Sequence, residues 1–171
     1  MKLRTLLLVH AGDRRTIGGS NRAVALVLKH PERIAELAAL LADREATLIM
    51  RAADALEKLA RREPRLVSPY RRHLIGALAD HPRWEVRLQV VRALPLFHWS
   101  PRQRVRVLEI LRRDVAHPNR FVRTWSLDSL ARFSEASPEL LPFIEQTLVE
   151  FERAGGALAV RARHIRSYLA R

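Results

Sequence analysis

The stretch HPRWEVR at residues 81–87 returns as HPNRFVR at residues 117–123, 36 residues further along the chain. Both copies share the frame His-Pro-x-x-x-Val-Arg, and a leucine follows eight residues after each valine. The Val-Arg pair returns at residues 160–161, and an earlier copy begins at Leu48. The four starts are 38, 36 and 38 residues apart, and insertions in loops account for the variation. This spacing indicates an internal structural repeat.

Each copy is expected to begin an amphipathic helix. In the second copy, apolar residues stand at offsets 0, 4, 7 and 8, which is the spacing of one buried face of an α-helix. They are Val86, Val90, Ala93 and Leu94. Apolar or small residues hold the same offsets from Leu48 and Val122. In the last copy, counted from Val160, His164 falls at offset 4 and is expected to be buried.

A second helix is expected upstream of each of these helices. The candidates are residues 32–42, 69–79, 101–116 and 138–153. Three of them begin with a Ser-Pro pair, in which serine can cap the helix and proline suits the first helical position. The pairs stand at residues 68–69, 100–101 and 137–138. Alternating β-branched residues and Asn-Gly turns, which would signal strands, are missing. The sequence therefore predicts an all-α protein.

A helical pair of this length cannot bury its apolar face alone, so the copies are expected to stack. The prediction is a right-handed α-solenoid of about four helical pairs. It forms a single domain over residues 1–171, with a helical cap at 1–29. The repeats are expected at about residues 31–62, 64–98, 101–134 and 138–170. The cap is expected to hold a short helix over Lys2–Ala11 and a turn at Gly18-Gly19.

The segment Asp80–Leu94 reads Asp-x-x-x-x-x-Val-Arg followed by a helix rich in Ala and Leu, and it resembles the second helix of a HEAT repeat. The resemblance covers about residues 31–170. It implies a solenoid whose second helices line the concave face, and a scaffold or adaptor function. It also implies that Arg87, Arg123 and Arg161 tie neighbouring repeats together. The first and last repeats depart from the pattern, as terminal capping repeats do.

The composition is that of a globular domain, with 171 residues of which 48% are apolar and 29% charged. The chain has no cysteine, which excludes disulfides, thiolate metal sites and cysteine nucleophiles. No apolar stretch reaches the roughly 20 residues of a membrane span, and the apolar run at residues 6–9 is too short for a signal peptide. A cytoplasmic location is expected.

The chain is strongly basic, with a net charge of +13. Residues 1–63 contribute +4, residues 64–137 contribute +8 and residues 138–171 contribute +1. Such an excess favours a polyanionic partner, which is a nucleic acid, an anionic membrane surface or an acidic protein. The alternative is a composition bias, since only three of the 31 basic residues are lysines.

Offsets 3, 6 and 10 of the repeated helices form a second stripe, which is expected to face the concave surface. The candidate binding residues are Arg51, Arg92, Trp125, Asp128, Arg132, Arg163 and Arg166. The alternative is a solvated face in which Asp128 and Arg132 form an ordinary helix-surface ion pair. Trp125 stands where other repeats carry polar residues, so it either stacks on a ligand ring or fills the core.

No catalytic or metal site is expected. The sequence holds no His-Glu-x-x-His, no Gly-x-Ser-x-Gly and no phosphate-binding Gly-x-x-x-x-Gly-Lys motif. No cofactor and no small-molecule substrate is therefore predicted. The leading hypothesis is a non-enzymatic repeat scaffold that binds a protein partner through a basic concave face.

Two alternatives stay open. The first is sequence-independent binding of nucleic acid through Arg51, Arg92, Arg132, Arg163 and Arg166, driven by contacts with phosphates. The second rests on a resemblance to alkylpurine DNA glycosylases built on HEAT-like repeats. These enzymes use aromatic residues and an aspartate on a basic concave surface, as Trp125, Asp128 and Arg132 would be placed here.

Overall fold

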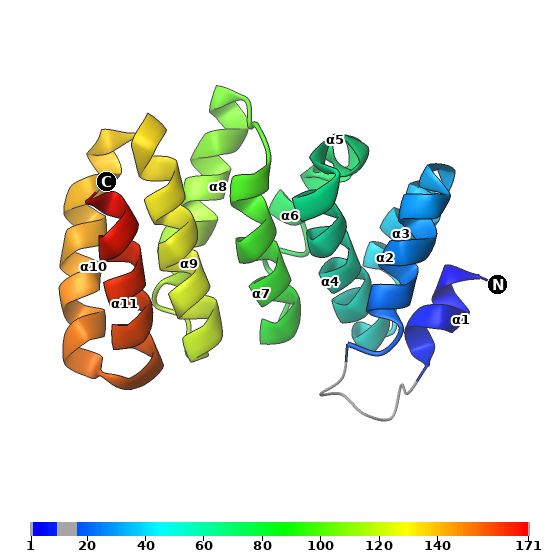
Figure 1. The fold of residues 1–171 in the computed structure, drawn as a ribbon, viewed down its shortest axis with the longest axis horizontal. Coiled ribbons are helices and arrows are strands. Elements are labelled where there is room, and N and C mark those ends of the chain that lie inside the picture. Colours follow the sequence, from blue (N-terminus) through cyan, green and yellow to red (C-terminus); the bar gives the residue numbers. More distant parts are fainter. Residues whose placement is uncertain (1, 10–16, 171) are drawn as a thin grey trace. The chain divides into compact units, whose positions relative to one another are not determined.

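The computed structural model describes residues 2–9 and 17–170, so part of the predicted N-terminal helix and loop lies outside the described residues. The chain forms two compact units, Met1–Phe97 and His98–Arg171. Every regular element among the described residues is a helix, and none is a strand, so the all-α prediction is confirmed (Figure 1). The predicted repeat boundaries stay a prediction.

Unit 1 combines three long or medium helices with several short ones. Its α-helices are α1 (Leu3–Leu8), α2 (Ser20–Lys29), α3 (Ile34–Ala39), α4 (Ala46–Arg62), α5 (Pro64–Val67), α6 (Arg72–Ile75) and α7 (Trp84–Ala93). Its 3₁₀ turns are η1 (Pro31–Arg33), η2 (Leu40–Ala42), η3 (Ser68–Tyr70) and η4 (Leu94–Leu96). Helix α4 is central, because it packs against α1, α2, α3, α5 and α7.

Unit 2 is built from four helices of 14 residues each. They are α8 (Pro101–Asp114), α9 (Arg120–Phe133), α10 (Leu141–Ala154) and α11 (Gly156–Leu169), and the turns η5 (Ser134–Ala136) and η6 (Pro138–Leu140) join α9 to α10. Helix α8 packs on α9, and α11 packs on both α9 and α10 (Figure 1).

The buried faces predicted for the first three copies are confirmed. Val86, Val90 and Ala93 are fully buried on α7, and Leu94 is fully buried at the start of η4. On α4 the set that begins at Leu48 is fully buried too. On α9, Val122 and Leu130 are fully buried together with the small residues between them. Removing this apolar surface from water is the main stabilising contribution to each unit.

The register predicted for the last copy is wrong. Val160 is 59% exposed and His164 is exposed, whereas Ala159, Ala162 and Ile165 are buried. The His-Pro turn is replaced here by Gly155 and Gly156, whose φ angles of 72° and 56° favour glycine. This connection joins α10 directly to α11, so the buried face falls on a different set of residues.

One of the three predicted Ser-Pro starts coincides with the start of an α-helix, and a second leads into one through a 3₁₀ turn. Ser100 caps α8, because its hydroxyl accepts a hydrogen bond from the Gln103 amide and the Gln103 side chain bonds back to the Ser100 amide. Pro138 begins the turn η6 that leads into α10. The helix predicted over residues 69–79 is wrong, because Pro69 lies in a 3₁₀ turn and α6 ends before Gly76. Hydrogen-bonded turns continue from there to His81.

Charged side chains from other helices hold both ends of the short helix α1. At its start, the Leu3 amide donates to Glu36 Oε1 at 2.6 Å. At its end, the fully buried Arg51 donates from Nη1 to the carbonyl oxygens of Leu7 at 2.7 Å and Val9 at 2.9 Å. Partial desolvation raises the pKa of Glu36, but hydrogen bonds from Leu3 and Arg33 outweigh it and hold that pKa below its usual range.

Replacing Arg51 by methionine tests this arrangement. The variant keeps much of the side-chain volume but leaves the Leu7 and Val9 carbonyl groups without their donor. We expect the free energy of unfolding to fall by about 2–3 kcal/mol in urea denaturation. The matched control is Arg22→Met, an exposed arginine on α2, which should change it by less than about 0.5 kcal/mol. Equal effects of the two changes would contradict the capping role of Arg51.

Candidate binding surface

The seven predicted binding residues lie on four helices. Arg51 and Arg92 belong to unit 1, on α4 and α7. The other five belong to unit 2, with Trp125, Asp128 and Arg132 on α9 and the remaining two on α11. Their exposure differs widely, so the uniform exposed stripe expected from the sequence is wrong.

On α4 the polar stripe is buried instead of exposed. Arg51 is bonded to carbonyl groups of the α1 segment, and Asp54 is 3% exposed. Asp54 accepts hydrogen bonds from the Ser20 hydroxyl at 2.5 Å and from Lys58 Nζ at 2.6 Å. These residues fasten α1 and α2 to α4, so Arg51 presents no surface to a partner.

Arg92 joins two helices of unit 1. Its Nη2 lies 3.3 Å from Oε1 of Glu57, a fully buried carboxylate on α4 that also pairs with Arg61. Its Nη1 lies 3.3 Å from the Gln89 side-chain oxygen. The Arg92 side chain is 24% exposed, so its main observed role is to tie α7 to α4.

The most organised group of predicted site residues surrounds Asp128 in unit 2. The Asp128 side chain is buried, and its two oxygens accept separate arginines. Arg132 Nε lies 3.0 Å from Oδ2, and Arg161 Nη1 lies 3.1 Å from Oδ1. One carboxylate therefore holds two guanidinium groups, from α9 and α11, in fixed positions, and the group carries a net charge of +1.

Aromatic rings complete this group. The Arg161 guanidinium lies 4.2 Å from the ring centre of Trp125, and that of Arg132 lies 6.0 Å from the Tyr168 ring. Both distances are within the range of cation–π attraction. The Tyr168 hydroxyl donates to the backbone oxygen of Asp128 at 3.2 Å. We call Trp125, Arg132, Arg161 and Tyr168, with Asp128 beneath them, the α9–α11 surface.

The α9–α11 surface is accessible to a partner at several points. Arg132 is 50% exposed and Arg161 is 25% exposed. Trp125 and Tyr168 are each half-buried. The exposed His164 lies 5.8 Å from the Tyr168 ring in an edge-to-face arrangement. The expectation that His164 is a buried core residue is therefore wrong.

The last two predicted residues differ from each other. Arg163 is exposed. Arg166 pairs with Glu145 at 2.7 Å and with Glu152 at 2.6 Å, both on α10. The hydrogen bond from Arg166 holds the pKa of Glu152 below its usual range. Arg166 thus links α10 and α11 across an exposed edge.

Sequence reasoning did not assign Arg161 and Tyr168 to the candidate surface. The HEAT resemblance implies that Arg161 ties neighbouring repeats together, and its partner is Asp128 on α9. Tyr168 stands eight residues after Val160, at the offset that carries a leucine in the earlier copies, so the repeat pattern predicts a buried residue there. Both contact α9 because the register of α11 differs from the repeat pattern. The sequence feature that accompanies this difference is Gly155-Gly156 in place of the His-Pro turn.

Two classes of site are absent from the described residues, 2–9 and 17–170. Among these residues, no group of three or more histidine and carboxylate side chains could hold a metal ion. No helix there has the length and apolar character that crossing a membrane requires.

No protein-family model matches the chain, and a comparison with curated proteins finds no match either. Solved structures do match. An engineered protein from the Northeast Structural Genomics Consortium is 18% identical with a TM-score of 0.67, over 95% of this chain and 77% of that one. A designed armadillo repeat protein is 15% identical with a TM-score of 0.64, and the match covers 95% of this chain and 79% of that one. Another designed armadillo repeat protein, solved in complex with the peptide (KR)4, is 16% identical with a TM-score of 0.61. That match covers 96% of this chain and 79% of the designed one.

The fold is a helical-repeat solenoid. The likeness to these engineered and designed proteins supports this fold class together with the all-helical structure of both units. At 15–18% identity it speaks for the fold alone. The finer assignment to HEAT repeats stays a prediction.

Tyr168 gives the α9–α11 surface a measurable pH signature. Burial raises the pKa of its hydroxyl above the usual 10.0, and the nearby Asp128 carboxylate adds to this. The raised pKa contributes stability that is fully present below pH 10 and is lost as the pH rises further. We expect tyrosinate absorbance in a Tyr70→Phe variant, whose one tyrosine is Tyr168, to appear only above pH 10. Ionisation below this pH, in the folded state, would contradict the burial of its hydroxyl.

Proposed function

We propose that the protein is a non-enzymatic helical-repeat scaffold that binds an acidic segment of a partner protein through the α9–α11 surface. The observation that carries the proposal is the pair of guanidinium groups held by the buried Asp128. A buried carboxylate fixes their orientation before binding, which lowers the entropy cost of engaging a ligand. Arginine donors in fixed positions suit the planar carboxylate groups of a partner.

The fold likeness supports a peptide or protein as the partner. One of the similar designed armadillo repeat proteins was solved in complex with a basic peptide, (KR)4. This chain carries a net charge of +13, so a basic segment would be repelled and an acidic one attracted. Trp125 and Tyr168 add half-buried aromatic area, and such residues contribute strongly to protein interfaces.

The geometry does not favour the glycosylase alternative. A catalytic aspartate must reach the substrate or an attacking water molecule. Asp128 is fully buried, and each of its oxygens already accepts an arginine. It is therefore placed to orient Arg132 and Arg161, and we assign it no catalytic role.

The five arginines proposed for nucleic-acid binding do not form a common exposed set. Arg51 is buried, Arg92 pairs with Glu57, and Arg166 pairs with two glutamates. Arg132 and Arg163 are the exposed members of that set. Nucleic-acid binding by this set therefore has less support than protein binding, and it is one outcome of the test below.

The test measures binding of a fluorescein-labelled peptide of ten glutamates by fluorescence anisotropy. Arg132→Gln removes one charge from the α9–α11 surface and should weaken binding about three- to tenfold, up to about 1.4 kcal/mol. Arg102→Gln, which removes the charge of an exposed arginine at the start of α8, is the matched control and should change binding less than twofold. Both variants are checked for unchanged helical content.

Equal weakening by the two substitutions would mean that only overall charge matters, and would contradict the assigned surface. A labelled single-stranded oligothymidine is measured in parallel. The protein-partner proposal is wrong, and the surface is a nucleic-acid site, if two results occur together. The oligothymidine binds more tightly than the peptide, and Arg132→Gln weakens oligothymidine binding as much as it weakens peptide binding.

A further inference from the structure

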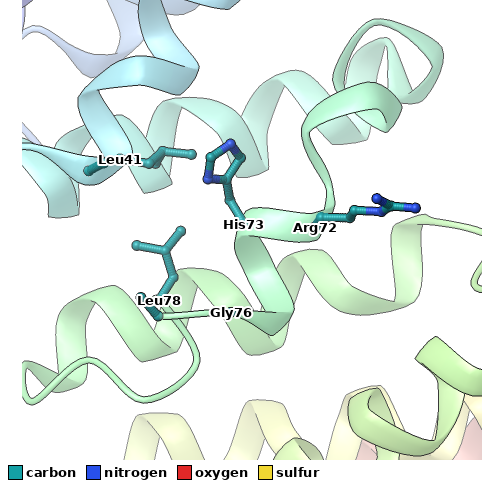
Figure 2. A pocket seen from close by; sticks show the side chains of 7 residues that line it. Leu41, Arg72, His73, Gly76 and Leu78 are labelled. Carbon is teal, nitrogen blue, oxygen red and sulfur yellow. The ribbon is translucent and has the colours of Figure 1, made fainter.

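Unit 1 contains a cavity that the proposed function does not use. Its volume is about 290 Å³, and its lining residues include Leu41, Ala42, His73, Ala77 and Leu78. Leu41 and Ala42 belong to η2, and His73 belongs to α6. Figure 2 shows the His73 ring directed toward Leu41, with Leu78 on the adjoining wall.

The cavity lies where the expected outer helix is broken. In place of one helix over residues 69–79, the chain forms η3, the four-residue helix α6 and a series of turns. Gly76 leaves the helical conformation with φ of −96° and ψ of −138°, which ends α6. Pro69 has no amide hydrogen, so α5 does not continue through it into α6. The interrupted helix leaves Leu41, Leu78 and the small side chains Ala42 and Ala77 around an open space.

The size and lining of the cavity suit one apolar side chain. Its 290 Å³ is at the lower limit of the roughly 300–1,000 Å³ of typical small-molecule sites. Two leucines and two alanines provide apolar walls. Ala42 and Ala77 are exposed, so the space is reached from the surface. A leucine or phenylalanine side chain inserted there would transfer its apolar surface from water to the protein interior, which favours binding.

The charges around the cavity favour an acidic ligand. Its charged or titratable lining residues are His73 and Arg72, both exposed, and none is a carboxylate. The Arg72 side chain extends away from the other labelled side chains, and so adds charge to the surface beside the cavity (Figure 2). Asp43, next to Ala42, pairs with Arg4 and accepts the Glu45 amide.

We propose that this cavity is an anchor site for one leucine or phenylalanine of an acidic segment of a partner protein. The apolar side chain enters between Leu41 and Leu78, and flanking carboxylates lie near His73 and Arg72. The site is separate from the α9–α11 surface, and it does not depend on the function proposed for that surface.

The experiment compares two labelled nine-residue peptides, one with a central phenylalanine between glutamates and one with serine at that position. Fluorescence anisotropy gives the ratio of their affinities, which isolates the anchor from general charge attraction. In the unmodified protein the phenylalanine peptide should bind about tenfold more tightly, as expected for burial of an aromatic side chain. Ala77→Trp fills the cavity from its exposed side and should bring this ratio close to one.

Two further variants make the result decisive. Ala42→Trp fills the cavity from η2 and should act like Ala77→Trp, so the test survives if one variant does not fold. Arg132→Gln should weaken both peptides or neither and leave their ratio unchanged, which separates this site from the α9–α11 surface. A ratio near one in the unmodified protein, or a ratio that both filled variants retain, would overturn the proposal. The proposal would also be overturned if oligothymidine displaced the phenylalanine peptide from the unmodified protein but not from Ala77→Trp, because the cavity would then be a nucleic-acid site.

Discussion

Buried charged side chains that bond to neighbouring helices are the interaction on which both units depend. Arg51, Glu57 and Asp128 have no measurable exposure, yet each is charged. A charged group can be buried only when partners replace the water it has lost. Each of these groups has at least one partner outside its own helix: carbonyl oxygens of the α1 segment for Arg51, Arg92 for Glu57 and Arg161 for Asp128. Each such contact fixes one helix relative to another. The apolar faces supply the driving force for packing, and the pairs select the arrangement.

This arrangement also determines which charges remain available for binding. In unit 1, the polar side chains of α4 bond to groups on α1, α2 and α7, so little of their surface can reach a partner. In unit 2, the buried Asp128 engages Arg132 and Arg161 while leaving parts of both guanidinium groups at the surface. The same type of ion pair is therefore purely structural on α4 and supports a candidate binding surface on α9.

Much of the fold could be predicted because helical periodicity reports which face of a helix is apolar. The faces beginning at Leu48, Val86 and Val122 are buried as expected. Periodicity does not report how much of a helix's circumference is covered by the neighbouring helices. Helix α4 has packed neighbours on several sides, so Arg51 and Asp54 are buried although they lie off the apolar stripe. The register of α11 depends on the Gly155-Gly156 connection, whose conformation the repeat pattern does not contain.

The most direct measurement of the central claim is a double-mutant cycle between Glu57 and Arg92, the pair that joins α4 to α7. The free energies of unfolding of Glu57→Gln, Arg92→Gln and the double variant are compared with that of the unmodified protein. If interhelical ion pairs hold the unit together, the two changes are coupled by about 0.5–3 kcal/mol. Additivity to within about 0.3 kcal/mol would show that the two side chains act independently and would contradict the account.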